Sequence, residues 1–300
     1  MFNVITEPIR GCLSLTLYVL NTVFWCLLLF IVAAAKAMIP LKSWRRKCSR
    51  TLNVIAENWI WVNNLNQKLT SNTRWIVEGV ENLERSQWYL VLANHQSWVD
   101  ILVMQRVFYR KIPLLKFFLK KELFWFPFLG QAWWVLDFPF VNRYSRKHIQ
   151  QNPHLKGKDL ENIRKACAKF KTNLVSVMNF VEGTRFTIEK HTRQKSPYAH
   201  LLKPKAGGIA YVLGEMEDHI HRLLDVTIVY HGGKPSFWAF LCGNIRKVKV
   251  RVRSLPVSSE LMGDYLNDGL FRNNLQLWLN DLWNEKDRCI AEMLGSWPKV

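Results

Sequence analysis

In "VLANHQSWVD", residues 91–100, an apolar run is followed directly, without loop residues, by a polar stretch that holds a histidine and a carboxylate. The run predicts a buried strand that ends near residue 93, and the carboxyl ends of strands border the ligand crevice in open α/β sheets. Asp100 follows His95 by five positions, so the intervening turn can fold the carboxylate back onto the imidazole. There it would fix the tautomer and stabilise the imidazolium that forms when His95 takes a proton. The spacing predicts a general base.

The same stretch has a purely structural alternative. Ser97-Trp98-Val99-Asp100 also matches a capping box, in which the first and fourth side chains bond the free N–H groups at a helix start. In that case Asp100 would only begin the helix predicted from residue 98. Taken alone, the stretch leaves both interpretations open.

A second apolar strand also ends in a polar turn, in "NFVEGTRF", residues 179–186, which holds Glu182, Gly183, Thr184 and Arg185. Glycine lets the backbone approach a ligand closely, and an exposed guanidinium can clamp a phosphate with two hydrogen bonds. A lone EGTR is more often a surface turn, and pairing of Arg185 with Glu182 would merely stiffen it. A third turn, "FPFVNRYSR" at 138–146, carries Arg143 at the end of a predicted strand.

The charge balance predicts a partner that carries negative charge. The chain has 300 residues with 42 Lys+Arg against 23 Asp+Glu, a net charge of +19. A chain with this charge is expected to bind nucleic acid, an anionic membrane or a phosphorylated substrate. Its 14 tryptophans favour the membrane, because tryptophan is enriched at the lipid–water interface. The six cysteines show no CxxC spacing, which argues against a zinc site or a disulfide framework and fits a reducing compartment.

The amino-terminal segment predicts a membrane anchor over residues 1–40. Residues 13–35 contain no charged side chain and are long enough to span a bilayer. Five Lys and Arg residues lie between positions 42 and 50, and the positive-inside rule keeps them in the cytoplasm. Residues 41–72 predict a basic amphipathic interfacial helix region. A cleaved signal peptide and a pair of helices dipping into one leaflet are the alternatives.

Residues 73–300 predict one α/β domain, a mixed, largely parallel sheet flanked by helices, that ends in a carboxyl-terminal helix. Apolar runs predict strands at 75–78, 88–93, 134–140, 174–181, 224–230 and 246–253. Amphipathic patterns predict helices at 98–109, 118–126, 158–170, 206–216 and 270–293. The alternation in "RKVKVRVR" predicts a half-buried strand whose basic face is wet. The aromatic-rich segment 116–140 suits either core or lipid contact.

Taken together, these blocks resemble the glycerolipid acyltransferase family. Its N-H-x4-D motif is met by Asn94, His95 and Asp100. Its second block is similar to Phe140-Val141-Asn142-Arg143, and its third, F-P-E-G-T/S-R, to Phe180-Val181-Glu182-Gly183-Thr184-Arg185. Its fourth block, an apolar strand, is similar to 225–230. Val181 stands where the family usually has proline, and the fourth block lacks proline too. The long insertion after the third block resembles 1-acylglycerol-3-phosphate acyltransferases, and bacterial inner-membrane members resemble the chain most.

The resemblance implies transfer of a fatty acyl group from acyl-CoA or acyl carrier protein to the sn-2 hydroxyl of a lysophospholipid, with lysophosphatidic acid giving phosphatidic acid. His95 and Asp100 would be catalytic, and Asn94, Arg143, Glu182, Gly183, Thr184 and Arg185 would bind substrate. Transfer would be direct, without an acyl-enzyme, since the chain has no G-x-S-x-G. The donor is a co-substrate; no metal and no further cofactor is implied.

The implied partners are anionic membrane lipid, the lysophospholipid and the acyl donor, with no nucleic acid. The implied location is the bacterial inner membrane, with the catalytic domain in the cytoplasm. Two alternative functions fit the same sequence. An acyl-CoA thioesterase would apply the His95 base to water, and a non-catalytic basic membrane protein would bind nucleic acid through the net charge of +19.

Overall fold

A six-stranded mixed sheet forms the centre of the computed structural model, which describes residues 2–141, 158–171 and 173–297. The strand order is β1-β8-β7-β2-β6-β3, and every neighbouring pair is parallel except β7 with β8. The strands are β1 (Arg74–Glu78), β2 (Trp88–Ala93), β3 (Leu115–Phe117), β6 (Ser176–Phe180), β7 (Ile220–Tyr230) and β8 (Lys247–Pro256). The predicted fold class, a mixed, largely parallel sheet flanked by helices, is confirmed.

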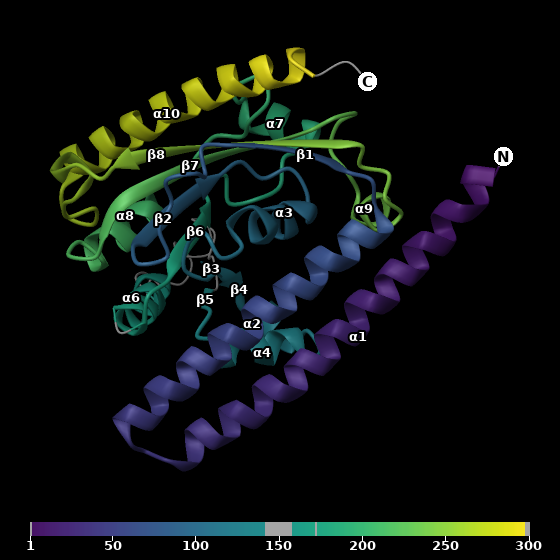
Figure 1. Ribbon diagram of the computed structural model, residues 1–300. Coiled ribbons are helices and arrows are strands. Elements are labelled where there is room, and N and C mark those ends of the chain that lie inside the picture. Colours follow the sequence, from purple (N-terminus) through teal and green to yellow (C-terminus); the bar gives the residue numbers. More distant parts are fainter. Residues whose placement is uncertain (1, 142–157, 172, 298–300) are drawn as a thin grey trace.

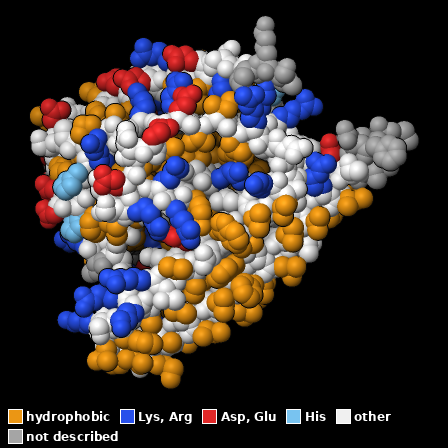
Figure 2. Space-filling model, viewed as in Figure 1, with side chains coloured by type: hydrophobic (Ala, Val, Ile, Leu, Met, Phe, Trp, Pro, Cys, Tyr) orange, Lys and Arg blue, Asp and Glu red, His pale blue; other side chains and the backbone are white. Residues whose placement is uncertain are grey.

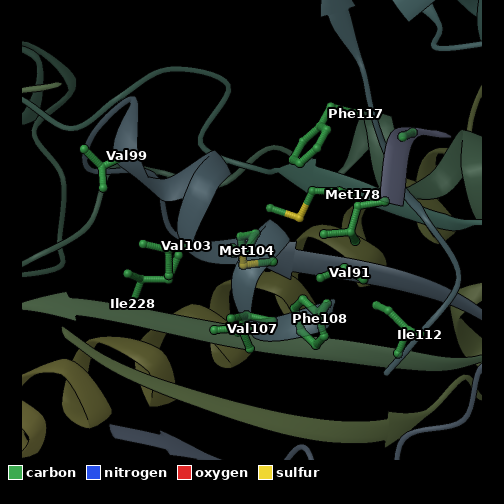
Figure 3. Packing of buried hydrophobic residues seen from close by; sticks show 14 of the residues in the cluster. Val91, Val99, Val103, Met104, Val107, Phe108, Ile112, Phe117, Met178 and Ile228 are labelled. Atoms are coloured by element: carbon green, nitrogen blue, oxygen red, sulfur yellow. The ribbon is translucent and has the colours of Figure 1, made fainter. Parts of the chain in front are cut away.

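Helices cover both faces of the sheet (Figure 1). One face carries α6 (Lys158–Phe170), α8 (Gly207–Glu215) and α10 (Gly269–Gly295), whose apolar side chains pack against Leu90 and Leu92 of β2. The other face carries α3 (Val99–Phe108), whose Val103, Met104 and Val107 point towards the strands in Figure 3. Because alternate β2 side chains enter opposite layers, the apolar run of β2 is buried on both sides.

The basic face of β8 is covered at Lys247 and Lys249, so the predicted wet face is wrong there, whereas the Arg251 and Arg253 side chains are 35% and 36% exposed. Lys247 and Lys249 are buried, and the Nζ of Lys249 donates to the Ser296 carbonyl at 2.6 Å, just beyond the end of α10. The helix predicted at 270–293 packs over this face, which the alternation in β8 could not reveal. The same helix brings buried Lys286 to the strands, where its Nζ lies 2.5 Å from Asp225 Oδ1.

The aromatic segment 116–140 departs from its predicted elements. The predicted helix at 118–126 is a two-residue strand, β4 (Leu119–Lys120), followed by the 3-10 helix η1 (Lys121–Trp125). The predicted strand at 134–140 is mostly the end of α4 (Leu129–Val135) and a turn, and only its last residue enters β5 (Phe140–Val141). Proline at 127 and at 139 interrupts both patterns, and periodicity alone does not separate helix from strand in short apolar runs.

The same segment provides both core and surface. Phe117 and Phe138 are buried, whereas four aromatic side chains are exposed by 43–78%: Trp125, Phe126, Phe128 and Trp134. The structure also contains elements that the sequence did not predict, namely β3, α7 (Ile188–Gln194), α9 (Phe237–Leu241) and η3 (Ser259–Leu261).

The amino-terminal helices α1 (Phe2–Met38) and α2 (Lys42–Thr70) form a long antiparallel hairpin along one side of the molecule (Figure 1). Among the described helices, α1 alone is long and apolar enough to cross a membrane, over Thr6–Met38. Polar side chains join the two helices: Asn21 Nδ2 donates to Asn63 Oδ1 at 2.8 Å, and Gln67 Nε2 donates to the Tyr18 hydroxyl at 3.0 Å. The helices end near residues 40 and 72; the division into functional segments stays a prediction.

Candidate active site

The turn between β2 and α3, residues 94–98 and here the His95 turn, brings the predicted base and its carboxylate together. His95 Nδ1 lies 2.8 Å from Asp100 Oδ2, and the His95 side chain is 14% exposed while that of Asp100 is fully buried. A carboxylate at that distance accepts a hydrogen bond from Nδ1–H, which leaves Nε2 as the imidazole's acceptor. The spacing of five residues therefore places a partly exposed imidazole in front of a buried carboxylate.

Asp100 also caps the start of α3. Its Oδ2 accepts hydrogen bonds from the backbone N–H groups of Gln96 at 2.6 Å and Ser97 at 2.9 Å, while the Val99 N–H donates to Ser97 Oγ at 3.2 Å. The Ser97-to-Asp100 bond is one half of a capping box, whereas Ser97 Oγ accepts from Val99 and not from Asp100. The two interpretations of the sequence are therefore compatible, because one carboxylate serves both purposes.

Tyr230, at the end of β7, completes the carboxylate's set of partners. Its hydroxyl donates to Asp100 Oδ1 at 2.6 Å, and burial together with the Asp100 charge raises the pKa of Tyr230 well above its ordinary value. Tyr230 therefore remains a neutral donor. The sequence analysis missed this residue because only the fold places the end of β7 opposite Asp100.

Phe180, the last residue of β6, sets the plane of the imidazole. Its ring stacks on the His95 ring with centroids 3.9 Å apart and an interplanar angle of 15°. The sequence assigned Phe180 only to a motif block and gave it no role. Stacking and the Asp100 contact together fix the imidazole in two directions.

Asn94 fixes the point at which β2 ends and the His95 turn begins. Its Nδ2 donates to the Ile228 carbonyl at 3.0 Å, and the Ile228 N–H donates to its Oδ1 at 2.9 Å. The side-chain amide thus extends the β2–β7 hydrogen-bond pattern by one step and is fully buried. This geometry favours a positioning role, and direct contact of Asn94 with substrate stays a prediction.

The second polar turn, residues 182–186 and here the Glu182 turn, is tied to the His95 turn. Buried Glu182 accepts the His95 N–H on Oε1 and the Leu202 N–H on Oε2, both at 3.1 Å, and the Phe186 N–H donates to the His95 carbonyl at 2.8 Å. Burial raises the pKa of Glu182 to about 8, and the Asp100 charge adds to this, although the two N–H donors and Lys286 oppose it.

Arg185 is not held by Glu182. Its guanidinium lies over the Trp98 ring, 4.5 Å from the ring centroid, in a cation–π contact that keeps the charge at the surface of the turn. The alternative in which Arg185 pairs with Glu182 is therefore not what the structure contains.

The remaining predicted substrate-binding residues of this turn lie beside lysine side chains. Gly183 has φ +69°, a conformation that side chains rarely adopt, and Lys205 Nζ lies 3.5 Å from where a Cβ would stand. Thr184 Oγ1 accepts from Lys190 Nζ at 2.8 Å. Arg143 and its neighbour Asn142 lie outside the described residues.

The Glu182 turn is surrounded by cations whose charge is not matched by acids. Lys190, Lys205 and Lys234 stand around it with Arg185, and Lys234 Nζ lies 3.2 Å from the centroid of the Phe186 ring. Within the described part of the chain, none of these four has a carboxylate oxygen within 4.0 Å. The described residues also contain no group of three His, Cys, Asp or Glu that could hold a metal ion. The arrangement is a partly exposed imidazole beside a surface that attracts anions.

The chain is similar to known acyltransferases. Residues 74–229 match the family model described as Acyltransferase. The chain is 25% identical over 232 residues to mouse 1-acyl-sn-glycerol-3-phosphate acyltransferase epsilon, covering 69% of this chain and 58% of that protein. It is 26% identical over 215 residues to 1-acyl-sn-glycerol-3-phosphate acyltransferase 3 of Arabidopsis thaliana, covering 66% of this chain and 51% of that protein. The chain thus spans little more than half the length of these curated relatives.

A solved structure shares the fold. The crystal structure of the 1-acyl-sn-glycerophosphate (LPA) acyltransferase PlsC from Thermotoga maritima superposes with a TM-score of 0.54 at 20% identity. The superposition covers 98% of this chain and 100% of that one.

Removing the Tyr230 hydroxyl tests whether it positions the Asp100 carboxylate. We expect Tyr230→Phe to lower kcat about tenfold, the lower end of the range for a hydrogen bond to a charged group, with little change in KM. The acid limb of the pH–rate profile should move to higher pH, because Asp100 then directs more of its charge towards the imidazolium. Tyr198→Phe, which removes a hydroxyl bonded to the Asn280 carbonyl, is the matched control. An unchanged pH profile would reduce Tyr230 to a packing residue.

The pKa of Glu182 predicts a pH dependence of stability. Its folded pKa of about 8 lies above its ordinary 4.5, so between these pH values the folded protein holds a proton that the unfolded chain releases. The free energy of unfolding should therefore fall as the pH rises from about 5 to about 8, and Glu182→Gln should remove this part of the slope. Exposed Glu122→Gln serves as the control. Parallel melting-temperature curves for wild type and Glu182→Gln would show that Glu182 is already ionised at the acidic end of this range.

Proposed function

The chain belongs to the acyltransferase family, and from this premise we propose that it moves a fatty acyl group from acyl-CoA or acyl carrier protein to the sn-2 hydroxyl of a lysophospholipid. The proposed acceptor is lysophosphatidic acid, the substrate after which the structural relative and the curated relatives are named. The observation that carries the proposal is the accessible His95 with its Asp100 partner beside unmatched cations.

In the proposed reaction His95 Nε2 removes the proton from the acceptor hydroxyl as its oxygen attacks the thioester carbonyl. The new C–O ester bond forms, a tetrahedral intermediate follows, and the C–S bond then breaks. The proton passes from the imidazolium to the leaving thiolate, so the enzyme returns to its starting state. Asp100 stabilises the transient imidazolium, and Tyr230 and the backbone N–H groups keep the carboxylate facing the ring.

The acceptor's phosphate would lie against the Glu182 turn. Arg185 presents its charge there through the Trp98 contact, and Lys190 and Lys205 flank the same turn. Arg143 belongs to this proposal through its motif block. A guanidinium offers a phosphate two parallel hydrogen bonds, which orients the glycerol hydroxyl as well as binding the headgroup.

We further propose that α1 and α2 lie in one leaflet on the cytoplasmic side of the bacterial inner membrane. Gly11 of α1 packs so closely against α9 that a Cβ there would lie 3.0 Å from the Trp238 ring, and α1 also contacts α4. A helix docked on the domain at both places cannot cross a bilayer without carrying the domain with it. Its outer face is apolar (Figure 2), formed by exposed side chains that include Leu13, Leu17, Leu20, Phe24, Leu27 and Ile31.

Removing the base tests the proposed function. We expect His95→Ala to lower acyl transfer about 10²–10⁴-fold, the usual effect of losing general-base catalysis, while melting temperature stays near that of wild type. Asp100→Asn should also be severely impaired. The assay offers acyl-CoA with several lysophospholipids in vesicles and identifies the product by mass spectrometry. Thioester loss without consumption of lysophospholipid would instead indicate a thioesterase.

Arg185 variants test the phosphate contact. Arg185→Ala should weaken transition-state binding of lysophosphatidic acid about 10- to 150-fold, equivalent to roughly 1.5–3 kcal/mol for a charge-assisted contact. Arg185→Lys should be intermediate, because lysine keeps the charge but loses the planar fork. KM for the acyl donor should change little in either variant. Arg222→Ala, an exposed position near the start of β7, is the control; an unchanged acceptor KM and kcat in Arg185→Ala would end the proposal.

Fusion reporters test the membrane arrangement. A reporter that is active only in the cytosol should be active when fused to either end of the chain, because a hairpin in one leaflet keeps both ends on one side. A spanning α1 would inactivate one of the two fusions. A mature protein that begins near Met38 would show instead that the segment is a cleaved signal peptide.

A further inference from the structure

An exposed basic surface lies beside the active site, and the proposed chemistry does not use it. We call it the α7 surface: Ile188, Arg193, Lys195 and Lys203, all exposed. They belong to the segment 183–205, which contains six Lys and Arg residues and one acidic residue, Glu189, for a net charge of +5. Within the described residues, none of the three cations of the α7 surface has a carboxylate oxygen within 4.0 Å.

The α7 surface is fixed in place. Thr187 caps α7 by accepting the Lys190 N–H, and a ring nitrogen of His191 lies 2.6 Å from the Tyr198 carbonyl. The segment is also bound to α10, where Asp287 accepts the N–H groups of Ala199 and His200, each at 2.8 Å. Its charges are therefore held in a set arrangement instead of being carried on a loose loop.

Helix α7 packs on the Glu182 turn, so the α7 surface lies close to the candidate active site. On the inner side of α7, Lys190 Nζ donates to Thr184 Oγ1 and to the Arg185 carbonyl, so the helix rests directly on the Glu182 turn. The Glu182 turn in turn bonds the His95 turn through Phe186. A partner on the outer side of α7 would stand about 10 Å, one helix diameter, from the Glu182 turn.

We propose that the α7 surface docks the acyl donor in the form of a small acidic carrier protein, whose acyl thioester hangs on a flexible prosthetic arm. This inference rests on the proposed function and names its donor. The cations proposed to bind the acceptor's phosphate lie at the Glu182 turn, whereas Arg193 and Lys195 are exposed in the last turn of α7 and at its carboxyl-terminal cap. Unmatched charge spread over a fixed surface favours an acidic protein face, because such complementarity steers association and sets orientation.

The position of α7 also suits a water-soluble donor. In Figure 1, α7 lies beside α10, whereas the α1–α2 hairpin runs along the other side of the molecule. The apolar band in Figure 2 follows α1. A lipid acceptor would therefore arrive from the hairpin side and a soluble carrier from the α7 side, with His95 between them.

Charge reversal on the α7 surface tests the proposal with the full-length protein in vesicles. The double variant Arg193→Glu/Lys195→Glu is assayed with two donors that carry the same acyl chain, acyl-CoA and acyl carrier protein. We expect KM for the carrier protein to rise about tenfold, as for lost electrostatic steering, while KM for acyl-CoA stays within about twofold. The control Lys111→Glu/Arg222→Glu changes the net charge equally at exposed positions, in the turn before β3 and near the start of β7, and should affect neither donor.

Several outcomes would overturn the proposal. Both donors could be affected equally, with loss of binding to anionic vesicles, which would make the α7 surface a membrane contact. The double variant could leave both donors unaffected, or wild type could use acyl-CoA and reject the carrier protein. A wild type that uses neither donor would instead contradict the proposed function.

Discussion

The buried carboxyl group of Glu182 makes the contacts on which the rest of the site depends. It accepts one N–H from the His95 turn and one from Leu202, so a single side chain joins the end of β6 to the end of β2 and to the segment that follows α7. A buried carboxyl group without hydrogen-bond partners is destabilising, so these bonds support the fold. They also place His95, the Glu182 turn and the α7 surface in one fixed relation.

Asp100 serves several hydrogen-bond donors of the site at once. Its two oxygens accept four hydrogen bonds: two from backbone N–H groups of the turn, one from Tyr230 and one from the imidazole. The bonds that begin α3 are thus the same bonds that hold the carboxylate against the imidazole. Variants of Asp100 must therefore be compared by stability as well as by turnover.

Buried hydrogen bonds also fix the hairpin of α1 and α2 at the other side of the domain. Polar side chains such as Asn21, Asn63 and Gln67 pair across the two helices, so the outer face of α1 is left almost wholly apolar. Hydrogen bonds between apolar helices fix their register, since van der Waals packing alone discriminates poorly between registers. The exposed aromatic side chains of η1 and α4 continue this apolar side.

Local patterns in the chain were enough to predict the type of sheet, most of its strands, and the turns that carry His95, Asp100 and Glu182. Apolar runs and strand-end turns are properties of neighbouring residues, so they can be read before the chain is folded. The contacts of Tyr230 with Asp100, of Phe180 with His95 and of Glu182 with the His95 turn exist only in the folded molecule, since they join residues 85 to 130 positions apart. The structure also differs from the prediction in the segment 116–140, where short apolar runs interrupted by proline do not separate helix from strand, and at Lys247 and Lys249 of β8, where burial depends on the packing of α10. Long-range packing, which no local pattern encodes, converted separate turns into one site.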